Sequence, residues 1–199
     1  MALKPERIFA HEPVMRTIAW DDEGMGGTDA VFLNGTVGVG KSAVAEALAE
    51  LEERGGTSHA VIDLDYIRRF WPAPGGDPFN LALELANLEA VVANYRAAGA
   101  ERLILAGVIE RRGDVARYAA ATRAARLVVV RLTANRRSVD ERLRGRHAGD
   151  PAGLAWHLAR AGELAGILDA AGVDDISVDT SGLTPAEVAG EVRRVAGWQ

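Results

Sequence analysis

The chain has 199 residues, no cysteine and a formal net charge of −5, and 48% of its residues are hydrophobic. This balance is typical of one soluble globular domain, and the absence of cysteine excludes disulfides, thiolate metal sites and cysteine nucleophiles. We find no apolar run of membrane-spanning length and no signal-peptide pattern, and the acidic balance argues against broad nucleic-acid binding. We therefore expect a cytoplasmic protein that binds neither membranes nor nucleic acids.

The chain divides by composition near residue 28. Residues 1–28 contain Pro5, Pro13 and a glycine-rich stretch at 24–27, with little periodicity, and we interpret them as an N-terminal extension. From residue 29 onward, apolar strand patterns alternate with helical patterns, which predicts one α/β domain over 29–199. The predicted strands span 30–34, 59–64, 101–106, 126–132 and 175–179. The predicted helices span about 41–54, 79–98, 114–124, 136–145, 151–171 and 184–196.

The strand patterns also predict how the sheet is covered. Several strands are almost continuously β-branched or leucine-rich, as expected where helices cover both faces of a parallel sheet. We therefore predict a three-layer α/β fold with a five-stranded parallel sheet.

A phosphate-binding loop follows the first predicted strand. The sequence GTVGVGKS, from Gly35 to Ser42, fits G-x-x-x-x-G-K-[ST] at every fixed position and lies between a strand and a helix. Glycine lets the backbone curl its N–H groups around a polyphosphate, and the following helix adds its N-terminal partial charge. We expect Lys41 to reach the β- and γ-phosphates of ATP and Ser42 to bind Mg²⁺. The predicted nucleotide contacts are Gly35, Val37, Gly38, Val39, Gly40, Lys41, Ser42 and Ala43.

A pair of aspartates ends the second predicted strand. Asp63 and Asp65 lie two residues apart, so in an extended segment they would share a face, at the sheet edge where parallel α/β proteins bind ligands. One carboxylate would serve Mg²⁺ and the other would take a proton from an attacking hydroxyl. Aspartate is also a common helix N-cap, which is the structural alternative.

The spacing from the phosphate loop to Asp63-x-Asp65-x-x-Arg68 resembles that of small P-loop kinases of the nucleoside-monophosphate-kinase-like group. The group includes adenylyl-sulfate, gluconate and shikimate kinases and chloramphenicol phosphotransferase. The resemblance runs from about residue 30 to the C-terminus. It implies that Asp63 lies near Mg²⁺, that Asp65 orients or deprotonates the acceptor, and that Arg68 binds substrate; the two aspartates could exchange roles.

An arginine-rich segment follows the fourth predicted strand, at 136–147. It resembles the lid that closes over ATP in these kinases, which implies that Arg142 and Arg146 stabilise the transferring phosphoryl group and that Arg136 stacks on adenine. Arginines on a solvated helix face would look similar. The stretch around Thr180 and Gly182 resembles the adenine-side loop, although an ordinary strand–helix connection would look much the same.

Residues 66–112 should select the acceptor. Trp71 lies in a loop rich in proline and glycine, and Asn87 belongs to a stripe of asparagines on the helix after it. Gly107, Glu110 and Arg111 follow the third strand, at the position of the substrate loop in shikimate-type kinases. Each is a candidate substrate contact. Arg160 and Glu163 are predicted to form a structural ion pair.

These features predict an ATP-dependent kinase that phosphorylates a hydroxyl group of a small molecule. The alternatives are a P-loop NTPase or switch without an acceptor, and a nucleotide or RNA kinase. The sequence contains no guanine-specific N-K-x-D, but it does not decide between ATP and GTP. It also leaves the acceptor and a homodimer open.

Overall fold

The computed structural model describes residues 29–198. The predicted N-terminal extension, 1–28, lies outside these residues, so that division of the chain stays a prediction. Within residues 29–198, no helix combines the length and the apolar character needed to cross a membrane.

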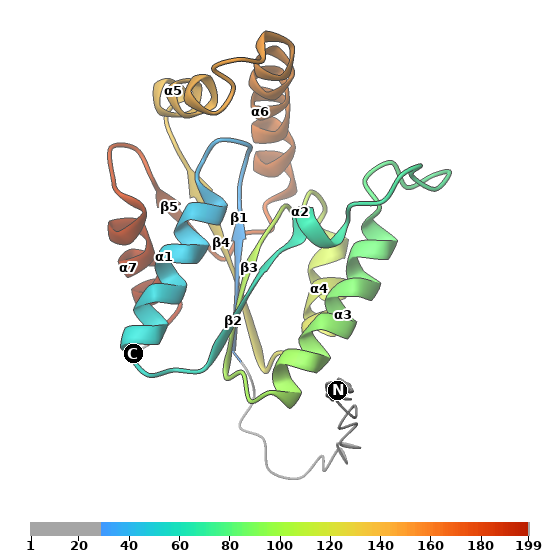
Figure 1. Cartoon of the computed structure of the whole chain (residues 1–199), viewed down its shortest axis with the longest axis vertical. Coiled ribbons are helices and arrows are strands. Elements are labelled where there is room, and N and C mark those ends of the chain that lie inside the picture. Colours follow the sequence, from blue (N-terminus) through green and yellow to red (C-terminus); the bar gives the residue numbers. More distant parts are fainter. Residues whose placement is uncertain (1–28, 199) are drawn as a thin grey trace, which may run out of the picture.

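Five parallel strands form the central sheet, as the sequence predicts (Figure 1). They are β1 (Asp29–Asn34), β2 (His59–Asp63), β3 (Arg102–Ala106), β4 (Arg126–Thr133) and β5 (Ile176–Asp179). Their order across the sheet is β2-β3-β1-β4-β5, so β1 is central, and Phe32 pairs with Leu105 on one side and Val129 on the other. The phosphate loop leaves the carboxyl end of this central strand.

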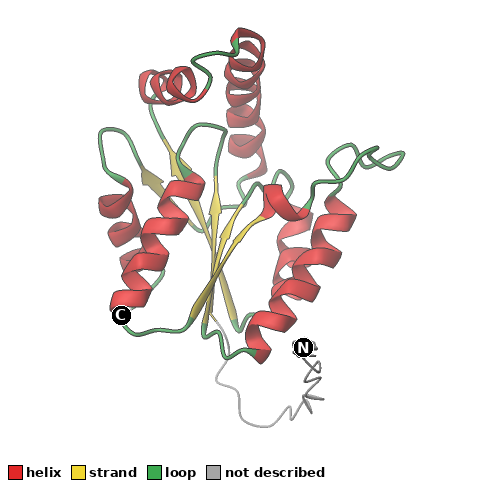
Figure 2. Ribbon diagram, in the orientation of Figure 1, coloured by secondary structure: helices red, strands yellow, loops and turns green. Residues whose placement is uncertain are grey.

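Helices cover both faces of the sheet (Figure 2). One face carries α1 (Lys41–Arg54) and α7 (Pro185–Val195), and the other carries α3 (Leu81–Ala97) and α4 (Arg112–Thr122). Alternate residues of β1 enter different cores, since Val31 and Leu33 pack on the first side and Ala30 and Phe32 on the second. The strands are apolar on both faces for this reason.

The remaining helices lie toward the carboxyl ends of the strands (Figure 1). They are α2 (Leu64–Ile67), α5 (Arg136–Arg146) and α6 (Pro151–Ala171). All three begin at asparagine or aspartate caps; for α5, Asn135 accepts a bond from the backbone N–H of Ser138, and for α6, Asp150 accepts one from that of Gly153. These caps fix where the arginine-rich segment and α6 begin.

The structure corrects the predicted end of the second strand. That strand stops at Asp63 rather than 64, and the short helix α2, which the sequence analysis did not predict, begins at once. The reason is local, because the Asp63 carboxylate accepts a 3.0 Å hydrogen bond from the Asp65 N–H and caps the helix. Leu64 is fully buried and holds this turn against the sheet.

Candidate active site

Gly35 opens the phosphate loop at a position that admits no side chain. Its φ is +148°, and a Cβ there would lie 2.6 Å from the carbonyl oxygen of Leu132. Asn34, fully buried at the end of β1, accepts hydrogen bonds from the N–H of Gly35 at 3.0 Å and from that of Ile109 at 3.1 Å. The start of the loop is therefore tied to the segment after β3. The sequence analysis did not single out Asn34, although a polar residue at the end of an apolar strand is a usable signal.

Lys41 is held across the phosphate loop. Its Nζ donates to the carbonyl oxygens of Gly35 at 2.9 Å and Thr36 at 3.1 Å. Burial lowers the pKa of Lys41 to about 8, although the nearby carboxylates of Asp65 and Asp63 oppose this shift. The ammonium group is thus poorly solvated and would gain from an anionic phosphate beside it.

Ser42 and Asp63 form the candidate Mg²⁺ site. The Ser42 Oγ donates a 2.8 Å hydrogen bond to the Asp63 Oδ2, at the N-terminus of α1. A hydroxyl and a carboxylate are the hard oxygen ligands that Mg²⁺ prefers, so these residues fit the ion. Within residues 29–198, no cluster of three or more His, Cys, Asp or Glu could hold a metal. Most of the ligands would therefore come from phosphate and water.

Asp63 and Asp65 do not share a face as expected. Asp65 lies in the first turn of α2, not in an extended segment, and its side chain is 66% exposed. Its Oδ1 lies 3.9 Å from the Arg68 Nε, whereas Asp63 turns toward Ser42. The geometry favours Asp63 on the metal side and leaves Asp65 accessible to an acceptor.

A cavity of about 310 Å³ lies beside the phosphate loop. Gly38, Val39 and Gly40 of the loop line it, together with residues of α1 and α5, Thr180 after β5, and the start of α7. The Arg142 guanidinium connects these walls, since it donates to the Val39 carbonyl at 3.0 Å, the Thr180 hydroxyl at 2.9 Å and the Thr180 carbonyl at 2.8 Å. Such a cavity, next to a polyphosphate loop, suits a nucleotide base.

The candidate nucleotide residues differ in their distance from this cavity. Ala43 and Arg146 line it. Arg136 is exposed at the start of α5 and Gly182 is exposed after β5, and neither lines the cavity. Val37 packs against the core beneath the loop. Arg142 lines the cavity, whereas Arg136, the residue expected to stack on adenine, does not.

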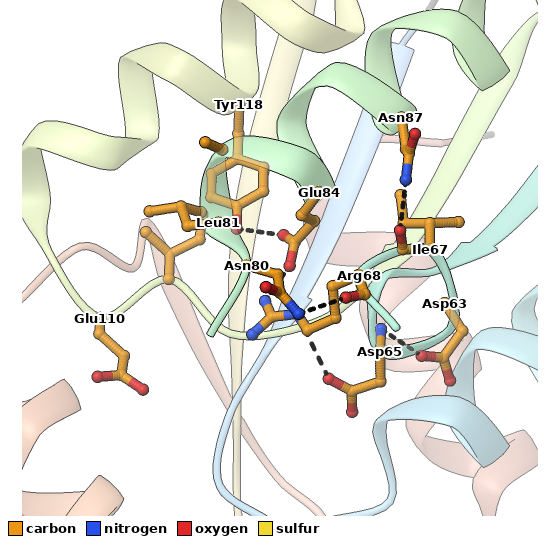
Figure 3. Close-up of polar contacts among 12 residues, drawn as sticks. Asp63, Asp65, Ile67, Arg68, Asn80, Leu81, Glu84, Asn87, Glu110 and Tyr118 are labelled. Atoms are coloured by element: carbon orange, nitrogen blue, oxygen red, sulfur yellow. Dashed lines mark hydrogen bonds and ion pairs between the residues drawn. The ribbon is translucent and has the colours of Figure 1, made fainter. Parts of the chain in front are cut away.

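A buried ionic network supports α2 from the side of α3 (Figure 3). Glu84 of α3 is fully buried, forms an ion pair with the Arg68 guanidinium, and accepts a 2.5 Å hydrogen bond from the Tyr118 hydroxyl. Burial raises the pKa of Glu84, and Arg68 opposes that shift. Arg68, a predicted substrate contact, is thus held mainly by the protein itself. The sequence analysis missed Glu84, although a carboxylate on an apolar helix stripe is a usable signal.

Asparagines of α3 hold the chain that follows α2. The Asn87 Nδ2 donates to the Ile67 carbonyl at 2.6 Å, and the Asn80 Nδ2 donates to the carbonyls of Arg68 and Phe70, both at 3.0 Å. Asn87 was a candidate substrate contact, and in the structure its amide stabilises the backbone.

The segment after β3 meets α6. Glu110 forms an ion pair with Arg160 of α6 at 2.5 Å, and Arg160 also forms the predicted pair with Glu163 at 3.0 Å. Gly107 packs so closely on α2 that a Cβ would lie 2.5 Å from the Leu64 Cδ1. Of the other candidate acceptor residues, Arg111 is exposed and Trp71 is 89% exposed.

Solved structures with the same fold are numerous, whereas no curated protein matches the sequence. The Deinococcus radiodurans tunicamycin resistance protein is 22% identical, with a TM-score of 0.61 over 86% of this chain and 97% of its own. The APS kinase of Mycobacterium tuberculosis, in complex with AMPPNP and APS, is 23% identical, with a TM-score of 0.54 over 86% and 98%. Shikimate kinase from Acinetobacter baumannii, in complex with shikimate, is 18% identical, with a TM-score of 0.54 over 84% and 92%.

At these identities the solved structures show the fold alone, an α/β domain with a parallel sheet. The family assignment comes from the sequence, because residues 31–153, from β1 to the first turn of α6, match the AAA domain family. The matched segment contains the phosphate loop, the aspartates and the arginine-rich helix. This chain is therefore a member of the AAA domain family, and its sheet has the five parallel strands described above.

Proposed function

We propose that this protein is an ATP-dependent kinase that transfers the γ-phosphoryl group to a hydroxyl of a small molecule. The observation that carries the proposal is the contact between Ser42 and Asp63 beside Lys41, with the accessible carboxylate of Asp65 two residues further along the chain, in α2. A nucleotide switch would need no such accessible carboxylate next to its phosphates. The similarity to APS and shikimate kinases supports the same reaction class.

Phosphoryl transfer depends chiefly on positioning and charge neutralisation. The loop N–H groups and Lys41 would bind the phosphates of ATP. Mg²⁺, held by Ser42 and Asp63, would supply charge neutralisation at the phosphate oxygens. Asp65 would accept the proton of the acceptor hydroxyl as its oxygen attacks the γ-phosphorus.

The two lid arginines take different roles in this proposal. Arg142 is already bonded to the loop and to Thr180, so it would position the nucleotide. Arg146 is exposed at the cavity and has no hydrogen-bond or ion-pair partner within residues 29–198, so it is free to contact the transferring phosphoryl group.

An ADP-release screen tests the proposal. ATP and Mg²⁺ are offered with tunicamycin, adenylyl sulfate, shikimate, gluconate and nucleosides as acceptors. We expect at least one acceptor to stimulate ADP release. Lys41→Ala and Asp65→Asn should each reduce that stimulated rate by at least about 100-fold.

Glu53→Gln is the matched control for Asp65→Asn, because it removes an exposed carboxylate at the far end of α1. It should leave the rate unchanged. If no acceptor changes the rate of ATP hydrolysis and Asp65→Asn keeps that rate, the kinase proposal is refuted in favour of an acceptor-independent NTPase.

A further inference from the structure

Two partly buried arginines that contact the candidate acceptor residues Asp65 and Glu110 are already neutralised by the protein. Arg68 is ion-paired with buried Glu84, and its Nε lies 3.9 Å from Asp65. Arg160, whose side chain is 14% exposed, lies between Glu110 at 2.5 Å and Glu163 at 3.0 Å. Each guanidinium thus faces two carboxylates.

An anionic acceptor would gain little from these arginines. To bind Arg68 fully it would have to displace Glu84, whose carboxylate would then stay buried without its charge partner, and that state is strongly unfavourable. At Arg160 it would meet the negative charges of Glu110 and Glu163. Figure 3 shows the carboxylates of Asp65 and Glu110 on the two sides of Arg68. Solvent and salt screen two further arginines, the exposed Arg111 and the exposed Arg69, which stacks on the Tyr66 ring.

The same region exposes aromatic side chains. Phe79, immediately before α3, is 52% exposed, and the Arg160 guanidinium lies 5.4 Å from its ring centre. Trp156, one turn before Arg160 on α6, is 60% exposed. Tyr66, next to Asp65, is 66% exposed. Phe79 and Trp156 thus expose aromatic rings around Arg160, the partner of Glu110, and such surface favours a ligand with a flat or apolar face.

We propose that the acceptor is an uncharged hydroxyl compound with a ring or apolar face that packs on Phe79 and Trp156. A small carboxylate, sulfate ester or phosphate ester, each of which is anionic, is disfavoured. This inference rests on the proposed kinase function, and it adds the charge and the surface character of the acceptor.

Matched pairs of acceptors that differ by one anionic group test the charge. Suitable pairs are glucitol with gluconate, shikimate methyl ester with shikimate, and uridine with its 6-carboxylate, orotidine, which keeps all the ribose hydroxyls. Acceptor-dependent ADP release is measured for each compound with wild-type protein, ATP and Mg²⁺. We expect stimulation only by uncharged members, with ring-bearing members at least 10-fold more effective in kcat/KM than glucitol.

The outcomes separate the two proposals. If anionic members stimulate as well as or better than their uncharged partners, the kinase function stands and the inference about the acceptor is wrong. If no member of either set stimulates, while Mg²⁺-dependent hydrolysis proceeds without acceptor, the kinase proposal itself fails.

Two variants test the aromatic contact. Phe79→Ala and Trp156→Ala should each raise the KM of a ring-bearing acceptor by about 10-fold while changing kcat less than 2-fold. Tyr95→Ala is the control, because Tyr95 is an exposed aromatic residue near the other end of α3. An unchanged KM in both variants would remove Phe79 and Trp156 from the acceptor surface.

Glu110→Gln, which frees one side of Arg160, should improve kcat/KM for the anionic member of a pair relative to its uncharged partner.

Discussion

The most informative single residue is Lys41, because its environment is arranged for a ligand rather than for stability. Burial removes the ammonium group from water and lowers its pKa to about 8, and within residues 29–198 its hydrogen bonds go to two carbonyl oxygens. In the unfolded chain the pKa of this lysine is 10.5, its ordinary value. At neutral pH the folded protein therefore keeps a charge where it is costly, and a bound polyphosphate would relieve that cost.

This cost predicts how stability depends on pH. Because the folded pKa is depressed, the unfolded chain binds more protons between about pH 8 and 10.5, so stability rises with pH across this window. We expect Lys41→Met to be more stable than wild type at pH 7, by at most about 3 kcal/mol. The advantage should shrink as the pH rises from 8 to 10.5. Urea unfolding of both proteins at several pH values measures it, and a difference that stays constant would contradict the burial of the ammonium group.

A second prediction at this scale concerns Glu84. Glu84→Ala leaves the Arg68 guanidinium without its buried partner and should destabilise the protein by about 3–5 kcal/mol. Tyr118→Phe removes only the hydroxyl that donates to Glu84 and should cost about 1–2 kcal/mol. Denaturant unfolding measures both values. Equal effects of the two variants would mean that the ion pair with Arg68 contributes nothing beyond the hydrogen bond.

Among the elements, α5 has the clearest functional placement. Its N-cap Asn135 starts the helix directly after β4, and Val139 and Leu143 bury one face, so Arg142 meets the phosphate loop. One guanidinium then bonds the loop and Thr180, which belong to segments that are distant in sequence. The helix is thereby attached to the wall of the cavity beside the phosphate loop.

Replacing this guanidinium tests the attachment. Lysine cannot reproduce the planar set of donors, so Arg142→Lys should weaken ATP binding by about 10-fold. Arg144→Lys is the control on the same helix, because Arg144 is exposed and its Nη2 lies 3.7 Å from the Asp140 Oδ2 in a surface ion pair. Isothermal titration with AMPPNP and Mg²⁺ measures both. Equal affinities would show that Arg142 does not organise the nucleotide site.

For the whole molecule, the candidate site gathers the ends of separate strands at one edge of the sheet. Four strands contribute to it at the carboxyl edge of the sheet: the loop after β1, Asp63 at the end of β2, Glu110 after β3 and Thr180 after β5. Because these segments are distant in sequence, a nucleotide bound between them stabilises the folded chain as a whole.

Ligand linkage gives a prediction at this scale. AMPPNP with Mg²⁺ at 100 times its Kd should add about 2.7 kcal/mol and raise the Tm by roughly 5–10 °C. Ser42→Ala should abolish the Mg²⁺-dependent part of that shift and keep the remainder. The exposed Ser177→Ala on β5 should behave as wild type. Differential scanning calorimetry with and without EDTA measures the shift. A full Mg²⁺-dependent shift in Ser42→Ala would exclude Ser42 from the ion site.

Much of the fold could be predicted because its signals are local. The apolar runs of the strands, the glycines of the phosphate loop and the Thr184 capping box of α7 each act within a few residues. The short helix α2 escaped prediction, since four residues give no periodicity and its cause is one side-chain cap by Asp63.

The sequence by itself determined the five-stranded P-loop fold and the phosphate loop with its lysine and serine, because these depend on hydrophobic periodicity and on residues adjacent in the chain. Only the tertiary structure decided that Asp63 meets Ser42, that Arg142 rather than Arg136 reaches the cavity, and that Glu84 and Glu110 neutralise Arg68 and Arg160. These contacts join residues up to about a hundred positions apart, and their partners are chosen by packing across the sheet edge, which no local pattern encodes.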